Sequence, residues 1–234
     1  MLDPSTLPKI TIKPGIWGDV SIVKDGRYIT LSHKGEQWHI FNVQNQREIH
    51  EQWSGYDLAY GDVLISGFGF GHIACWLANK PEVTSVTVIE VSQDVVNAFL
   101  ANNSLPDKVN VVIADINTYQ TDKHYDCIIL DHISNVIKEQ SFYQDLVKVG
   151  NNISHDLLWF WSIEMYYLRY HYDILLYKLY MIPISFDTYD FSTKWEELRE
   201  YLNMKSIPSL SKDKLDSYIN SYFLRHLLHK EPRQ

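Results

Sequence analysis

This sequence has few cysteines and no excess of positively charged residues. Its 234 residues include two cysteines, Cys75 and Cys127, which lie far apart in apolar surroundings. We expect both to be reduced, buried thiols of a cytoplasmic protein. Acidic residues number 29 against 21 lysines and arginines, which gives a net charge of −8. Because nucleic-acid binders normally present a basic surface, this balance argues against a nucleic-acid partner.

Uninterrupted apolar runs are missing as well. The N-terminus has no basic start followed by an apolar core, so we expect no secretory signal. The most apolar segment, residues 157–184, is interrupted by Glu164, Arg169, Asp173 and Lys178. A membrane-spanning helix would not tolerate charges at such intervals, so we expect a soluble protein with no membrane partner.

Several catalytic signatures are absent. No Lys-Ser/Thr pair follows a glycine loop, which excludes a P-loop, and there is no Gly-x-Ser-x-Gly elbow. Among ten histidines and two cysteines, the one pair at ligand spacing is His226-x-x-His229. That pair lies beside Lys230 on an expected terminal helix, where we interpret it as facing solvent, so we expect no metal site.

What the sequence does contain is an alternation of short apolar segments with helical segments. An apolar content of 45% is ample for a core. Near-continuous apolar strands separated by helices are typical of a mostly parallel sheet covered on both faces, so we predict a Rossmann-like α/β fold. Helical spacing predicts that Val95, Val96, Phe99 and Leu100 face inward. The expected strands are residues 63–66, 83–91, 109–115, 125–131 and 156–163, and the expected helices are residues 72–80, 93–102 and 141–149.

Two smaller regions flank this core. Residues 1 to about 15 carry three prolines and are typical of an extended arm. Between residues 17 and 43, Asp25-Gly26 and Lys34-Gly35 mark turns in an antiparallel sheet, and a helix is expected from 46 to about 60. After Ile163 the alternation stops. We therefore expect an arm and small sheet over 1–45, the Rossmann-like core over 46–163, and a helical extension packed on the core over 164–234.

The segment GDVLISGFGFG, residues 61–71, joins an expected strand to an expected helix through Gly67, Gly69 and Gly71. A strand that turns sharply into a helix exposes backbone N–H groups, and glycines let a ligand approach them closely. A tight turn with no ligand is the alternative for such a short pattern.

Acidic residues end three successive expected strands. Glu90 follows the glycine loop at close to the spacing of about 20 residues at which an acid meets a ribose. Asp115 and Asp131 end the next two strands. The carboxyl ends of parallel strands face one crevice, where ligands bind in open α/β sheets. Ordinary solvation explains any one acid in a turn, but three in series behind a glycine loop favour a binding site.

Loop and acids together resemble the class I S-adenosylmethionine-dependent methyltransferase superfamily. In that family the loop contacts the amino-acid part of the cofactor, the second-strand acid holds the ribose, and the third-strand acid contacts the adenine amino group. The resemblance implies a nucleoside-binding core that takes S-adenosylmethionine or its decarboxylated form. The implied cofactor-binding residues are Ser66, Gly67, Phe68, Gly69, Gly71, Glu90, Val91, Asp115, Ile116 and Asp131.

One branch of the superfamily is closer in pattern. Most members carry an acid two residues before the first glycine, where this chain has Ile65. The spermidine synthases, which are aminopropyltransferases, normally have an apolar residue there. Residues 85–99 are similar to that branch's second strand and the helix after it, and residues 125–134 with 141–147 are similar to its fourth strand and following helix. Ile49-His50-Glu51 is similar to its Tyr-His-Glu segment. The resemblance covers roughly residues 17–163 and is diffuse.

Two departures separate the chain from that branch. Its loop GGGDG has an aspartate where this chain has Phe70, and its Asp-x-x-Asp-Pro motif reads Asp-His-Ile-Ser-Asn over residues 131–135. In the branch these acids hold a polyamine, and a buried dication needs carboxylate partners. We therefore favour methyl transfer to a small-molecule acceptor, an amine among the candidates. Aminopropyl transfer to a shorter or differently charged amine is the alternative.

Asp131 and His132 are the expected catalytic residues. A carboxylate beside the transferred carbon can accept a proton from the attacking acceptor or orient it, while positioning supplies most of the rate. His50, Phe70 and Trp38 are expected to line the acceptor pocket, although structural roles are the alternative for each. In a third interpretation the chain binds a nucleoside without turnover, and the tyrosines after residue 165 form a partner surface. A homo-oligomer is left open.

Overall fold

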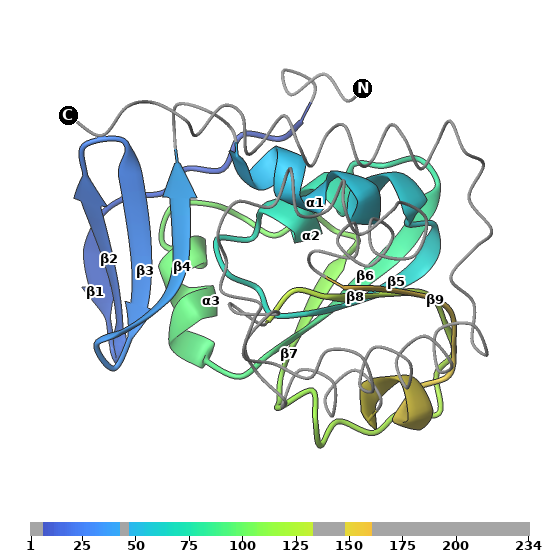
Figure 1. The fold of residues 1–234 in the computed structure, drawn as a ribbon. Coiled ribbons are helices and arrows are strands. Elements are labelled where there is room, and N and C mark those ends of the chain that lie inside the picture. The colour runs from blue at the N-terminus through green and yellow to red at the C-terminus, as the bar shows by residue number, and fades with distance from the viewer. Residues whose placement is uncertain (1–6, 43–46, 133–147, 161–234) are drawn as a thin grey trace, which may run out of the picture.

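The computed structural model describes residues 7–42, 47–132 and 148–160. Within these ranges the chain forms a small antiparallel sheet, a parallel sheet and the helices around it (Figure 1). The first part of the helix expected over 141–149 and the whole extension expected over 164–234 lie outside the described residues.

The antiparallel sheet consists of four strands in the order β1-β2-β3-β4. Its two tight turns lie where the sequence predicts them. Gly26 follows β2 with a φ of 55°, and Lys34 and Gly35 precede β4 with φ values of 51° and 81°. The strands are β1 (Gly15–Trp17), β2 (Val20–Asp25), β3 (Tyr28–His33) and β4 (Glu36–Asn42).

The parallel sheet has five strands in the order β7-β6-β5-β8-β9, and every adjacent pair is parallel, which confirms the predicted fold class. From β5 the chain builds outward to β7 on one side, then returns to build β8 and β9 on the other. The order reverses between β5 and β8, and the carboxyl ends of the strands beside such a reversal are the usual ligand position in open α/β sheets. The strands are β5 (Gly61–Ser66), β6 (Val83–Glu90), β7 (Val109–Ile113), β8 (Tyr125–Leu130) and β9 (His155–Phe160).

Helices cover both faces of this sheet. In Figure 1, α1 (Arg47–Leu58) and α2 (His72–Ala78) lie on one side, and a short helix over 148–152 lies on the other. The central strands are buried on both faces, which explains why β5 and β8 read as continuous apolar runs. Cys75 and Cys127 are buried free thiols, as expected.

For α3 (Gln93–Leu100), the prediction of which residues face inward is confirmed for three residues and wrong for one. Val95, Val96 and Phe99 are buried, whereas Leu100 is 46% exposed. Ala98 is buried instead, since it shares with Val95 and Phe99 the i, i+3, i+4 stripe of a helix. Leu100 lies about 100° further round the helix from Phe99 and faces solvent.

The antiparallel sheet packs against α3 through polar as well as apolar contacts. Asp19 N–H donates to Asp94 Oδ2 at 3.0 Å. Just after α3, the Asn103 side chain exchanges two hydrogen bonds of 2.9 Å with the backbone of Thr11 in the N-terminal arm. The first contact holds the small sheet beside α3, and the second holds the arm beside the segment that follows α3 (Figure 1). None of the helices in the described residues has the length and apolar character needed to span a membrane.

Candidate functional site

The glycine loop is a tight connection from β5 to α2. Gly67, Gly69 and Gly71 have φ values of 88°, 51° and 78°, all in the left-handed region that favours glycine. Gly67 N–H donates to the Ile89 carbonyl at 2.8 Å, which ties the start of the loop to β6. At Gly71 a Cβ would come within 2.8 Å of the Phe99 ring, so close packing as well as backbone conformation requires glycine there.

The residues between the glycines anchor the loop on two sides. Phe68 is buried and meets the Phe99 ring of α3 edge-on, with ring centroids 5.0 Å apart. Phe70 is buried against His39 of β4, with centroids 4.9 Å apart, and also contacts Phe41. The loop is therefore held between α3 and the antiparallel sheet.

The carboxylate of Glu90 is bound to this loop. Its Oε2 accepts the Phe68 N–H and its Oε1 accepts the Ser92 N–H, both at 2.8 Å. Burial raises the pKa of Glu90, while the backbone donors and the charge of His33 act in the opposite direction. Val91, which follows it, is exposed. The second-strand acid and the glycine loop, 22 residues apart, thus form one structural unit.

The third-strand acid lies at the adjoining strand end. Ala114 N–H donates to the Glu90 carbonyl at 3.0 Å, which holds the ends of β6 and β7 together. Asp115 is exposed, and its Oδ1 accepts the Asn117 N–H at 2.9 Å. Ile116 beside it is buried. An exposed carboxylate therefore sits next to an apolar side chain at this end of the sheet.

A polar cluster lies at the end of β5 and β8, beside Gly67. Ser66 Oγ is hydrogen-bonded to His132 Nδ1, and Asp131 N–H donates to the Ser66 carbonyl at 3.2 Å. Burial lowers the pKa of His132 to about 4, and the charge of Asp115 acts in the opposite direction. His132 is therefore neutral near pH 7, and Asp115 is close enough to influence it.

Sequence reasoning missed one member of this cluster. Gln52 of α1 is buried, and its Nε2 donates to Asp131 Oδ2. A polar residue beside Trp53 on a helix is a weak signal, since many such residues face solvent. Only the packing of α1 over the ends of the strands brings the amide to the carboxylate.

The three residues expected around an acceptor have different surroundings. Phe70 belongs to the buried anchor described above. Trp38 is at the surface, where it stacks on His33 with ring centroids 4.1 Å apart. His50 is in α1, but its side chain lies outside the described part of the structure.

A small hollow, partly open to solvent, lies beside the loop, but the predicted acids do not line it. Its walls include Gly69 and Phe70, Phe99 of α3, and Ile10 and Ile12 of the N-terminal arm. Glu90 and Asp131 are instead bonded to Phe68 and Ser66, the residues on either side of Gly67, and Asp115 lies at the adjoining strand end.

No protein-family model matches the chain, and no protein with a curated description matches it. Its fold is similar to those of solved spermidine synthases and methyltransferases. Spermidine synthase from Thermotoga maritima is 16% identical, with a TM-score of 0.42 over 61% of this chain and 52% of that one. A spermidine synthase in complex with the transition-state analogue AdoDATO is 15% identical, with a TM-score of 0.41 over 58% and 49%.

A DhpI complex with SAM and HEP is 16% identical, with a TM-score of 0.38 over 49% of this chain and 55% of that one. The chain therefore spans about half the length of each of these proteins. The glycopeptide N-methyltransferase MtfA is also similar, 18% identical with a TM-score of 0.37 over 47% of this chain and 52% of that one. At these identities the likeness concerns the fold alone, and function has to be argued from the site.

Proposed function

We propose that this chain is an S-adenosylmethionine-dependent transferase that moves a methyl group to a small-molecule acceptor. The observation that carries the proposal is the bond from the Phe68 N–H to the Glu90 carboxylate. It joins the glycine loop to the second-strand acid at the carboxyl ends of β5 and β6, where open α/β sheets bind ligands.

Glu90 has the acceptor capacity that a ribose needs. The carboxylate has about four lone-pair sites, and the backbone N–H groups of Phe68, Ser92 and Val91 are hydrogen-bonded to it. A ribose hydroxyl can use the remaining site without displacing the loop. Because the carboxylate is buried, hydrogen bonds to it are stronger than they would be in water.

The adenine end is assigned to Asp115 and Ile116. An adenine ring offers an apolar face and an exocyclic amino donor. Ile116 supplies apolar surface, and the exposed carboxylate of Asp115 supplies an acceptor for the amino group. We assign Ser66, Gly67, Phe68, Gly69 and Gly71 to the amino-acid end, with Val91 and Asp131 at the borders of the site.

When bound, S-adenosylmethionine supplies a methyl group on a positively charged sulfur. The chain contributes positioning and charge. Gln52 orients the Asp131 carboxylate, which attracts the sulfonium and can accept a proton from the acceptor or hold it in line. Burial keeps His132 neutral, so the imidazole does not repel the cofactor's charge. His50, Phe70 and Trp38 are proposed to border the acceptor.

The alternative is aminopropyl transfer from decarboxylated S-adenosylmethionine. The surroundings of Phe70 weigh against a long polyamine as its acceptor. The ring is packed among His39, Phe41 and His72, so no carboxylate is supplied where the spermidine synthases have one. An inactive nucleoside-binding protein is the further alternative. A cytoplasmic location stays a prediction of the sequence.

Calorimetry on the full chain tests the proposal. We expect S-adenosylmethionine and S-adenosylhomocysteine to bind more tightly than decarboxylated S-adenosylmethionine. Preference for the decarboxylated form would support aminopropyl transfer instead. Absence of binding by all three would overturn the nucleoside site. Where binding is found, formation of S-adenosylhomocysteine with a panel of small amines and hydroxyl compounds separates a transferase from an inactive binder.

A further inference from the structure

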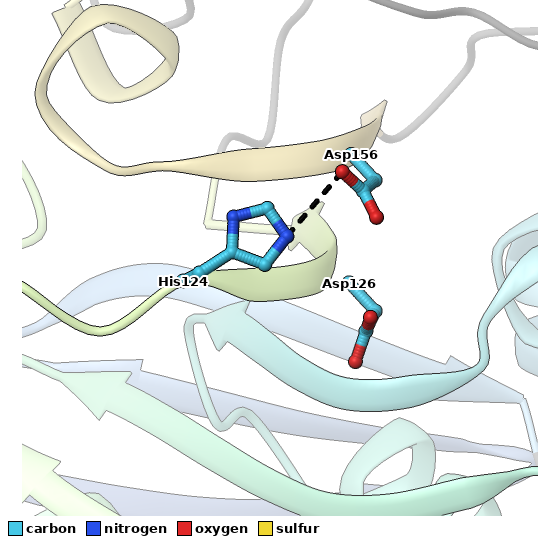
Figure 2. A group of neighbouring side chains, drawn as sticks. All are labelled: His124, Asp126 and Asp156. Carbon is cyan, nitrogen blue, oxygen red and sulfur yellow. Dashed lines mark ion pairs between the residues drawn. The ribbon is translucent and has the colours of Figure 1, made fainter.

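Three potential metal ligands meet at the other end of the parallel sheet from the glycine loop. His124 directly precedes β8, Asp126 is the second residue of β8, and Asp156 is the second residue of β9 (Figure 2). Tyr125 pairs with His155 in the register of these strands, which sets the two aspartates side by side. One donor atom from each residue lies within 4.8 Å of the other two.

His124 and Asp156 already have the separation of two metal ligands. His124 Nε2 lies 3.3 Å from Asp156 Oδ1. Two ligands at about 2.05 Å from a tetrahedral zinc ion are about 3.3 Å apart. His124 Nδ1 lies 2.9 Å from Ser154 Oγ, and a donor bond to that hydroxyl leaves the Nε2 lone pair facing the carboxylates. Such a partner on the second ring nitrogen is typical of metal-binding histidines.

Asp126 is also held in place. Its Oδ2 accepts the Asp62 N–H at 2.6 Å. The carboxyl group lies over Gly61, where any Cβ would collide with it. The carboxylate keeps further lone pairs for a cation. Two of the three ligands are therefore oriented by neighbouring strands before any ion binds, which lowers the entropy cost of binding.

The charges at this end of the sheet favour a divalent cation. Asp62, next to Asp126, is paired with Lys123 at 3.3 Å. Asp126 and Asp156 together carry two negative charges beside one histidine. Besides burial, the charges of both carboxylates raise the pKa of the nearby Tyr60. A dication with neutral His124 would balance these two charges.

We propose that His124, Asp126 and Asp156 bind one zinc-class divalent cation, with water completing its coordination. One nitrogen and two carboxylate oxygens suit zinc. Because the ligands come from β8 and β9, the ion would fasten β9 to the rest of the sheet. The sequence predicts no metal site, because His124 and Asp126, with one residue between them, gain their third ligand only through strand register.

Titration of the metal-stripped full chain with ZnCl2, followed by calorimetry, tests the proposal. We expect a one-to-one site in the wild type and at least about tenfold weaker binding in both His124→Ala and Asp156→Asn. Asp122→Asn is the matched control, since it removes an exposed charge near the site without removing a ligand. Ser154→Ala should weaken binding by about tenfold, as the loss of an outer partner does.

Equal zinc affinity in the wild type and both ligand variants would overturn the proposal, because zinc bound by His226 and His229 would survive those substitutions. The proposal would also be overturned if the wild type failed to bind zinc at about 100 µM, a concentration far above the working range of such sites. His124 and Asp156 would then form an ion pair and no metal site. Zinc at about a hundredfold excess over its dissociation constant should raise the unfolding midpoint by about 5–10 °C. Nucleoside binding does not depend on this site, so either proposal can fail alone.

Discussion

Glu90 Oε2 lies 2.8 Å from the backbone nitrogen of Phe68, so the carboxylate of the last residue of β6 holds the glycine loop in place. The same carboxylate reaches forward to the Ser92 N–H. Its geometry is set by the backbone on both sides, before any ligand arrives.

Replacing Glu90 tests the ribose assignment. We expect Glu90→Ala to weaken S-adenosylmethionine binding by about tenfold or more, since a hydrogen-bonded pair to a charged group is worth roughly 1.5–3 kcal/mol. Calorimetry measures the change. Glu82→Gln, at the exposed opposite end of the sheet, is the control. Unchanged affinity in Glu90→Ala would refute the assignment.

Replacing Asp131 separates binding from turnover. Asp131→Asn should still bind S-adenosylmethionine, less tightly because the charge that attracts the sulfonium is gone. It should lose turnover with whichever acceptor supports the wild type, because the amide cannot accept a proton as a carboxylate does. Gln52→Leu should lower kcat less severely, since it leaves the carboxylate present but unoriented. Product formation by mass spectrometry gives both values. Normal activity in Asp131→Asn would exclude Asp131 as the base.

The glycine loop can be tested by stability alone. Gly71→Ala forces a Cβ into the left-handed region and within 2.8 Å of the Phe99 ring. We expect it to lower the free energy of unfolding by about 2–4 kcal/mol. Gly26→Ala is the matched control, because its φ is also positive but its surroundings are open, and it should cost about 1 kcal/mol. Urea unfolding that gives equal losses would contradict the packing argument.

Buried histidines predict sensitivity to acid. Burial lowers the pKa of His72 to about 3 and that of His132 to about 4. Below the ordinary pKa of about 6.5, the unfolded chain binds protons that these folded imidazoles refuse. Stability should therefore fall as the pH drops from about 6.5 towards 4, by up to about 1.4 kcal/mol per pH unit for each histidine.

His72→Phe isolates one of these contributions while preserving the ring that stacks on Phe41. We expect urea unfolding at pH 7, 6 and 5 to show that the free energy of unfolding falls less steeply with decreasing pH in the variant. The difference should be up to about 1.4 kcal/mol per pH unit, the contribution of one proton. The free energy of unfolding of each protein at pH 8 is the reference for its own pH series. Parallel pH profiles for variant and wild type would show that His72 is protonated freely in the folded state.

Much of the fold can be predicted from the sequence because it depends on local patterns. β5 and β8 carry continuous apolar stretches since both faces of the sheet are covered, and Gly26 and Gly35 occupy turns that require positive φ. Leu100 was placed wrongly because an apolar residue at the end of a helix can turn outward at little cost.

The sites were harder to predict because they depend on contacts between distant segments. Glu90 and Asp131 are visible as acids at strand ends, but Gln52 reaches Asp131 across 79 residues and only through the packing of α1. Asp126 and Asp156 likewise become neighbours only through the register of β8 and β9. A single sequence gives the strand ends but not these pairings.

The burial of Phe70 against His39 has an evolutionary consequence. The glycine loop, to which we assign cofactor binding, is attached by its own aromatic residue to β4 of the antiparallel sheet, so the two regions cannot diverge independently. Any change to that sheet has to keep the apolar surroundings of this ring, or the loop loses its anchor.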